Sequence, residues 1–450
     1  MQGCDTTQYY IWYNDLGYEG KNICVSEGQG YGMVIEALMA GYDVNAKKYF
    51  DGLYRWYKAH PSTVNPVLMN WRQTKKNCAS NGDDAATDGD EDIAFGLLLA
   101  DKQWGSNGII NYLNEAKNII NAIMQSEVYN QSSYALQLGD WAHTSTQYKN
   151  GTRPSDFMMD HLRCFQLATN DNRWNNVLNE SYLLVRNMQT NFSASTGLLP
   201  DFVVNTDAVP APAPPNYLEG AYDGNYNYNA CRVPWRLAGD FLINADTTAK
   251  NACDKINNWI RGNSKNKPVK IRSGYYLNGT NLPGNNYQDL SFIAPFGVSA
   301  MTGSANQTWL NDLWNYIKGV TDITRDGYYG NTIKMQCMII MSGNWWTPNH
   351  LPAMQPAGAE TISQYIFQPM TVSPNPGKGN IVLNVYAYNN STANIMVYNT
   401  NGKAVYNKNE VLYKGNNSIS VYLQNAAAGV YFLQLKSNRV NRKISFVVEK

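Results

Sequence analysis

Apolar residues recur every three or four positions along most of residues 27 to 345, and this spacing predicts one helix after another. Clear examples are the stripes in segments 94–99 and 110–123, where aliphatic and aromatic residues share one helical face. Strand-like alternation is scarce in this part of the chain. We therefore predict an all-α domain of about ten or eleven helices, paired as an α/α toroid whose inner helices supply the loops that line a groove. The predicted helices are 27–41, 46–58, 90–102, 108–127, 156–169, 174–192, 230–245, 249–262, 306–319 and 329–342.

Two long loops interrupt these helices, at 59–87 and at 194–229. The second is rich in Pro, Asn and Tyr. A loop of this length inside a compact domain is more often functional than idle, so we expect both to border the site.

The pattern changes after about residue 351. Pro352, Pro356 and Pro369 indicate a linker, and period-two alternation follows from 381 onward. Strands are predicted at 381–386, 395–398, 417–424, 430–436 and 443–448, with a turn at 399–403. We divide the chain into a helical domain (1–350), a linker (351–370) and a small antiparallel β-sandwich (371–450), which holds no clustered catalytic side chains.

Composition narrows the possible functions. The formal net charge is +1, so no global field favours nucleic acid, and no apolar run approaches the ~18 residues of a membrane span. Aromatic residues make up 12%, with 12 Trp and 32 Tyr, which favours carbohydrate as ligand, although some must form the core. The seven cysteines are widely spaced and the four histidines scattered, so we expect buried thiols and neither a disulfide framework nor a metal or nucleotide cofactor. The first residues show no leader pattern.

One carboxylate, Glu27, lies among Gly28, Gly30 and Gly32 directly before a predicted helix. Glycines permit close approach of backbone or ligand, and a lone carboxylate there suits a general acid in the floor of a cleft. The alternative is an acid that only complements the helix N-terminus.

Two further acidic places are candidates. Residues 83–92 carry six acids in ten positions, of which Asp88 is the best candidate for binding a sugar hydroxyl; the alternative is again a helix start. Glu219 lies on the second long loop, where the alternative is an ordinary solvated carboxylate. Cleavage of a glycosidic bond requires a pair of carboxylates, one to protonate the leaving oxygen and one to activate water or attack the sugar.

Other residue types fit the same chemistry. Arg232 and Arg236 lie near one helix start, where guanidinium groups can orient carboxylates. The aromatic residues available to stack on sugar rings are Trp71, Trp104, Trp141, Tyr228 and Trp235.

Five motifs, which occur in order and span most of residues 20 to 345, resemble glycoside hydrolase family 8. The resemblance implies an (α/α)6 barrel and an endo-acting, inverting hydrolase of β-1,4-linked cellulose, mixed-linkage glucan, xylan or chitosan. The motifs are Ser26–Met33, Trp71, 86–94, 98–105 and 230–236.

Site residues carry over by position. Glu27 matches the family's general acid, and Asp88 matches the aspartate that binds and helps distort the sugar next to the scissile bond. Tyr228 and Arg232 match residues around the base. Trp71, Trp141, Asn229 and Trp235 complete the expected substrate-binding set.

One departure concerns the base. Many family members have an aspartate immediately after that tyrosine, whereas this chain has Asn229, whose amide cannot accept a proton from water. The resemblance extends to a subgroup with the same Asn, in which a glutamate on the preceding loop is the base. Glu219 is the best-placed carboxylate for that role. Asp223 competes with it, and Asp201 and Asp207 are weaker candidates. In an inverting pair the carboxyl groups lie about 6.5–9.5 Å apart.

The substrate prediction is chitosan, with a β-glucan as the alternative and xylan less favoured. Segments 50–54, 60–62 and 152–158 look most like the chitosanases of the subgroup. The acid-rich stretch at 83–92 would also suit the ammonium groups of chitosan.

The C-terminal module resembles the type A sorting domain of type IX secretion, through residues 373–377, 401–403, 429–432 and Lys443. It implies export, followed by release or attachment at the cell surface, with the secretion machinery and a polysaccharide as partners. We expect a monomer without nucleic-acid or membrane-spanning character.

About 25 residues precede the acid-bearing segment, whereas the family usually has a full helix there; either that helix is degenerate or the N-terminus is truncated. Rival interpretations are a non-catalytic carbohydrate-binding protein, a structural or adhesin role and an α/α-barrel lyase.

Overall fold

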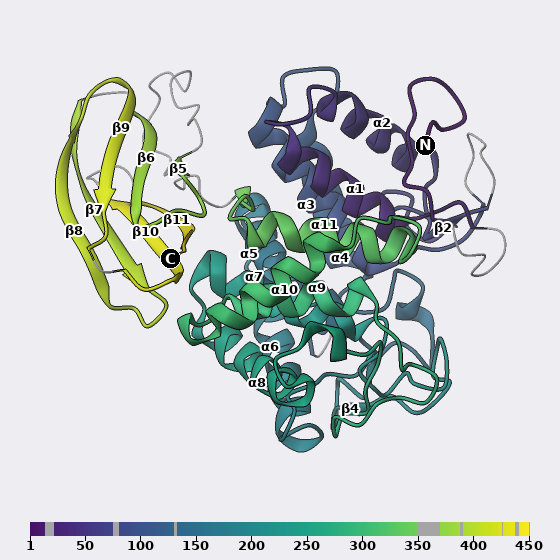
Figure 1. Ribbon diagram of the computed structural model, residues 1–450. Coiled ribbons are helices and arrows are strands. Elements are labelled where there is room, and N and C mark those ends of the chain that lie inside the picture. The colour runs from purple at the N-terminus through teal and green to yellow at the C-terminus, as the bar shows by residue number, and fades with distance from the viewer. Residues whose placement is uncertain are drawn as a thin grey trace.

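The computed structural model describes residues 1–13, 22–74, 81–129, 133–348, 370–387, 390–424, 426–436 and 441–449. Helices build the first part of the chain, and strands build the C-terminal part beside it (Figure 1). No helix among the described residues combines the length and the apolar character needed to cross a membrane.

Six helices form a closed inner ring. Each contacts the next one in the ring, and the last contacts the first again. Helices α3, α7 and α9 are buried along nearly their whole length, as expected for helices that are covered on all sides. The ring consists of α1 (Ser26–Met39), α3 (Thr87–Trp104), α5 (Met159–Thr169), α7 (Val233–Asn244), α9 (Leu290–Ala300) and α11 (Gly327–Met341).

Five helices cover this ring from outside, so the predicted α/α barrel is confirmed. Each follows an inner helix in the chain, packs against it and buries only one face, which is why the apolar stripes of these helices were easy to find. They are α2 (Ala46–Ala59), α4 (Tyr112–Ser126), α6 (Arg173–Asn191), α8 (Thr247–Ser264) and α10 (Gln307–Gly319).

Helix α9 was absent from the sequence prediction. All eleven of its residues are buried, so it has no polar face and no amphipathic period, and Pro295 within it argues against a helix. Its inclusion brings the described part of the chain to eleven α-helices. Residues 1–13 hold a β-bridge between Gln2 and Tyr9 but no helix.

The cysteines fall into two groups. Cys4 is disulfide-bonded, which the spacing did not predict. As expected for small apolar residues, the others that the structure describes lie buried in the core: Cys24, Cys164, Cys231, Cys253 and Cys337.

Both long loops contain short strands, and in the first loop a strand pairs with the residues directly before α1. Strand β2 (Arg72–Gln73) pairs with β1 (Cys24–Val25), immediately before α1. In the second loop β3 (Val203–Val204) pairs with β4 (Ala211–Pro212). In the residues that the structure describes, the first loop is therefore held beside the start of α1, and the second contains a short hairpin of its own.

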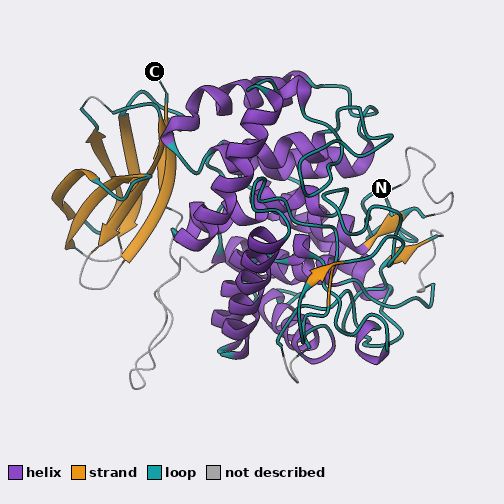
Figure 2. Ribbon diagram, turned by 90° about the horizontal axis from the view of Figure 1, so that it is seen from below, coloured by secondary structure: helices purple, strands orange, loops and turns teal. Residues whose placement is uncertain are grey.

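The C-terminal part is an antiparallel sandwich, as predicted (Figure 2). One sheet has the order β11-β10-β7-β8 and the other the order β5-β6-β9, with apolar residues of both sheets between them. The strands are β5 (Thr371–Ser373), β6 (Asn380–Ala387), β7 (Ser391–Asn399), β8 (Ala404–Leu412), β9 (Gly415–Tyr422), β10 (Gly429–Lys436) and β11 (Asn441–Val448). The sequence did not predict β8, because this edge strand is exposed along most of its length and carries little alternation. The predicted linker, except Met370, lies outside the described residues.

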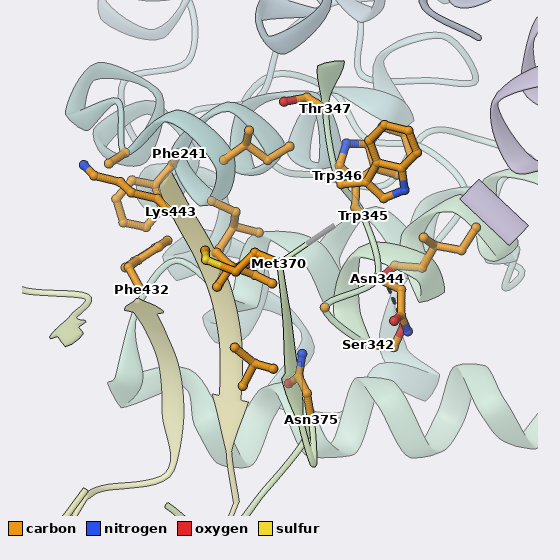
Figure 3. A pocket seen from close by; sticks show the side chains of 18 of the residues that line it. Phe241, Ser342, Asn344, Trp345, Trp346, Thr347, Met370, Asn375, Phe432 and Lys443 are labelled. Atoms are coloured by element: carbon orange, nitrogen blue, oxygen red, sulfur yellow. Dashed lines mark hydrogen bonds between the residues drawn. The ribbon is translucent and has the colours of Figure 1, made fainter. Parts of the chain in front are cut away.

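The sandwich contacts the barrel through aromatic side chains. The rings of Phe241 on α7 and Phe432 on β10 lie 5.8 Å apart, centroid to centroid. Beside them is an apolar cavity of about 1510 Å³, lined also by Trp345, Trp346 and Met370 (Figure 3). The acidic candidate residues Glu27, Asp88 and Glu219 are not part of its lining.

Candidate active site

Glu27 lies in the first turn of α1, and its side chain is 16% exposed. Oε2 accepts a hydrogen bond from Nη1 of Arg232 at 2.7 Å, and Oε1 accepts one from the hydroxyl of Tyr328 on α11. Burial raises the pKa of Glu27 to about 7, with Arg232 opposing the shift and Asp88 adding to it. Glu27 can therefore keep a proton near neutral pH, as a general acid must.

Glycines bring Glu27 and Asp88 together. A Cβ atom on Gly30 of α1 would lie 2.9 Å from the carbonyl oxygen of Gly89 on α3, and one on Gly89 would lie 2.6 Å from the backbone of Ser26. Only glycine at these positions lets the N-terminal turns of α1 and α3 approach so closely. The glycines of the acid-bearing segment thus serve the close helix approach.

Arg232 is the centre of the site, and its side chain is fully buried. Its Nη1 donates to Glu27, to Asp88 Oδ2 at 2.8 Å and to the hydroxyl of Tyr31 at 3.2 Å. Its Nη2 donates to Ser155 Oγ at 2.8 Å and to Oδ1 of Asn229 at 3.1 Å. A planar guanidinium with several donors can hold such a set of acceptors in fixed relative positions.

Asp88 bridges two arginines at the N-terminal end of α3. Besides Arg232, Nη1 of Arg153 lies 3.3 Å from its Oδ2. Burial opposes ionisation, but Arg153, Arg232 and the Gly89 N–H together lower the pKa of Asp88 to about 2. Asp88 is therefore an ionised acceptor, suited to a sugar hydroxyl and unsuited to proton donation.

Glu219 is the most exposed of the three predicted catalytic carboxylates, with half of its side chain open to solvent. Its Oε2 accepts a hydrogen bond from Nδ2 of Asn229 at 2.8 Å, and Oε1 lies 3.8 Å from Nη2 of Arg153. The amide oxygen of Asn229 accepts a hydrogen bond from Nη2 of Arg232. A chain of hydrogen bonds therefore runs from Glu27 through Arg232 and Asn229 to Glu219.

The competing loop acids have other partners. Asp223 is buried, and its carboxylate accepts from the backbone N–H groups of Leu218, Glu219 and Gly220 at 2.7–3.0 Å. Asp201 is buried too and accepts three backbone N–H groups, including that of Asn229 at 3.1 Å. Asp207 is exposed and borders a small surface pocket elsewhere. Asp223 and Asp201 thus shape the turns that present Glu219 and Asn229.

Tyr228 is half-buried beside this chain. Its hydroxyl lies 2.7 Å from that of Tyr287 and 3.1 Å from Oδ2 of Asp289, and its backbone carbonyl accepts from Tyr329. Tyr328 and Tyr329 were not among the predicted site residues, because no motif in the sequence of α11 singles them out. Arg153 and Ser155 lie within segment 152–158, but no local feature of the sequence indicated that they contact the site.

The predicted aromatic platforms have different surroundings. Trp71 and Trp141 are partly exposed and remain candidates. Trp71 is placed by β1–β2 pairing, since its carbonyl accepts from the N–H of Ser26 at 2.9 Å. Trp235, which was predicted to bind substrate, is 2% exposed, and the guanidinium of Arg236 lies 3.9 Å from the centroid of its ring, so it packs inside the barrel in this structure. Trp104 packs against Phe50, with 5.2 Å between the centroids of the two rings.

The acid-rich stretch at 83–92 does not form the surface for ammonium groups that its charge suggested. Asp90, Glu91 and Asp92 are fully buried in the barrel, so they cannot bind ammonium groups of a substrate. Asp92 accepts from Arg236 at 2.9 Å, whereas burial raises the pKa values of Asp90 and Glu91 well above their usual range. Of the six acids, Asp88 belongs to the site.

Comparison with known proteins gives two family matches. Glycosyl hydrolases family 8 matches residues 18–343, and the secretion system C-terminal sorting domain matches residues 371–449. A β-glucanase from Niallia circulans is 52% identical over 347 residues, 77% of this chain and 82% of the relative. An endoglucanase from Bacillus sp. (strain KSM-330) is 42% identical over 324 residues, 72% of this chain and 67% of the relative.

Solved structures agree with this fold. The apo structure of a β-1,3-1,4-glucanase from Paenibacillus sp. X4 is 51% identical, with a TM-score of 0.72, covering 77% of this chain and 88% of that one. Rex8A from Paenibacillus barcinonensis, complexed with xylose, is 20% identical with a TM-score of 0.61, covering 75% and 85%, and is similar in fold alone. The C-terminal sorting domain directs the protein out of the cell or to its surface. The catalytic part of the chain, with its α/α barrel and its cluster of carboxylates and arginines, belongs to glycosyl hydrolase family 8.

Proposed function

We propose that this glycoside hydrolase is an endo-acting, inverting β-glucanase that cleaves mixed-linkage β-glucan or β-1,4-glucan. The names of its relatives, a β-glucanase, an endoglucanase and a β-1,3-1,4-glucanase, support the substrate class. The observation that carries the mechanism is the hydrogen-bond chain from Glu27 through Arg232 and Asn229 to Glu219. It links two carboxylates, of which Glu27 is largely buried and Glu219 is half-exposed.

In this proposal Glu27 is the general acid and Glu219 the general base. Glu219 removes a proton from water as the water oxygen bonds to the anomeric carbon. Glu27 gives its proton to the glycosidic oxygen as the bond from that oxygen to the anomeric carbon breaks. The configuration inverts because water attacks from the face opposite the leaving group. Asp88, kept ionised by two arginines, accepts hydrogen bonds from the sugar between them.

The first substrate prediction, chitosan, is not supported. The relatives are named for glucans, and three of the acids that would have bound ammonium groups are buried. Asp90, Glu91 and Asp92 have no exposed surface, so they cannot contact a polymer in solution, whatever their charge. The alternative of a β-glucan is therefore the one that we carry forward.

Release of reducing ends from barley mixed-linkage glucan, carboxymethyl cellulose and soluble chitosan tests this proposal. We expect rapid hydrolysis of one or both glucans by the purified protein, a fall in viscosity early in the reaction that marks endo cleavage, and no comparable activity on chitosan. Strong activity on chitosan alone would contradict the substrate class. Binding of all three polymers without hydrolysis would favour the non-catalytic interpretation.

The pH dependence of kcat/KM follows from the proton on Glu27. Because burial raises the pKa of this acid to about 7, the protonated form predominates below that pH and is lost above it. We expect kcat/KM on mixed-linkage glucan to decline as the pH rises through about 7. Initial rates at low substrate concentration, measured from about pH 4 to about pH 9, check this. A rate that stays constant well above neutral pH would contradict the role of Glu27.

A further inference from the structure

Arg153 faces three carboxylates at the site. Nη1 lies 3.3 Å from Asp88 and 3.7 Å from Asp156, and Nη2 lies 3.8 Å from Glu219. The Arg153 side chain is 9% exposed and those of Asp88 and Asp156 are 5% and 0% exposed, so solvent screens these two attractions little. Glu219, which is half-exposed, meets Arg153 at the solvent side of the site. The guanidinium of Arg232 also interacts with Arg153.

The backbone next to Arg153 is hydrogen-bonded to the loop that carries Glu219. Thr152 exchanges two backbone hydrogen bonds of 2.9 Å with Val203 on the second long loop. The guanidinium lies over the ring of Phe202, 5.5 Å from its centroid, and the N–H of Phe202 donates to the carbonyl of Asp223. Asp223 closes the turn that contains Glu219. Arg153 therefore occupies a fixed place relative to that turn.

The two arginines of the site differ in their contacts. Arg232 is saturated with hydrogen bonds and touches Glu27 directly. Arg153 approaches its carboxylates at ion-pair distance, and its Nε is buried without a partner among the described residues. On Glu27 the charge of Arg153 has a smaller effect than that of Arg232. Arg153 can therefore attract the carboxylate of the base while it leaves the acid able to keep its proton.

We infer that Arg153 is a positioning residue for hydrolysis, which holds the Glu219 carboxylate directed toward the sugar that Asp88 binds. The inference rests on the proposed function. Glu219 is faced by Arg153, by the amide of Asn229 and, at longer range, by the buried acid Asp201. In the described parts of the chain, Arg153 is the one cation within 4 Å of Glu219. Loss of that cation loosens the position of the base.

Arg153→Met and Arg153→Lys test the role, with Arg163→Met as a matched control. Arg163 also pairs with two carboxylates, those of Asp240 and Asp246, but on α5 away from Glu219. We expect kcat on mixed-linkage glucan to fall at least about tenfold in Arg153→Met while KM changes less. Arg153→Lys should restore only part of kcat, because an ammonium lacks the fork that reaches both Asp88 and Glu219.

Arg163→Met should lower Tm and leave kcat nearly unchanged. An unchanged kcat in Arg153→Met would overturn the inference, as would an equal loss of kcat in Arg163→Met. These results are distinct from failure of the proposed function, which is a wild-type protein that hydrolyses neither glucan.

A thermal measurement tests the contact without relying on activity. Removal of Arg153 leaves the charges of Asp88, Asp156 and Glu219 less compensated, whereas in a Glu219→Gln background one of those charges is already gone. We expect the loss of Tm caused by Arg153→Met to be smaller in that background. Equal losses in both backgrounds would show that Arg153 does not hold Glu219 and would overturn the inference.

Discussion

Replacement of Glu27 by Gln is expected to lower kcat on mixed-linkage glucan by roughly 10²–10⁴-fold while the protein stays folded. The amide has the shape of the carboxyl group, and its oxygen can still accept from Arg232. It cannot deliver a proton to the glycosidic oxygen, and a sugar alkoxide leaves slowly without one. Steady-state kinetics at the optimum pH of the wild-type protein measures the loss.

The leaving group separates this role from a structural one. A gluco-oligosaccharide with a 2,4-dinitrophenyl leaving group needs little protonation, so Glu27→Gln should lose much less activity on it than on the polymer. Equal losses on both substrates would contradict a general acid. Glu36→Gln is the matched control, because Glu36 is a partly buried glutamate on the same helix whose pKa burial also raises to about 7. It should retain wild-type kinetics on both substrates.

Replacement of Glu219 by Gln should cause a comparable loss, again roughly 10²–10⁴-fold in kcat, and this loss should be alike on the polymer and on the activated substrate. The reason is that the base activates water, whichever group leaves. The new amide oxygen can still accept from Nδ2 of Asn229, so the loop keeps its contact. Asp207→Asn on the same loop is the control and should be unaffected, since Asp207 is exposed. A Glu219→Gln protein with near wild-type kcat would exclude Glu219 as the base.

Asn229 offers a sharper version of this test. The family resemblance of the sequence implies an aspartate base at this position in many members. In the double variant Glu219→Gln, Asn229→Asp, the new carboxylate could accept from both Arg232 and the amide introduced at position 219, which reverses one hydrogen bond and keeps the chain intact. We expect this double variant to recover part of the kcat lost in Glu219→Gln. Asn229→Asp alone should not gain activity, because it places two carboxylates in contact, one of which must take up a proton.

The sequence by itself determined those features that depend on neighbours along the chain. The outer helices appeared as apolar stripes and the sandwich as period-two alternation, because one face of each element is buried and the other is solvated. Glu27 stood out for a local reason as well, since it lies among glycines at a helix start. The motifs in their order also indicated the family.

Tertiary structure alone decided what burial and long-range pairing control. Helix α9 is enclosed on all sides, so no period reveals it, and Trp235 and Asp90 are ordinary site candidates until the barrel buries them. The proposal of Glu219 rather than Asp223 as the base depends on their partners, since Asp223 accepts from backbone N–H groups whereas Glu219 accepts from the side-chain amide of Asn229. Arg232 meets Glu27 across 205 positions of sequence. Such a contact arises only when the inner ring closes, because no local spacing encodes which side chains will share the space at its end.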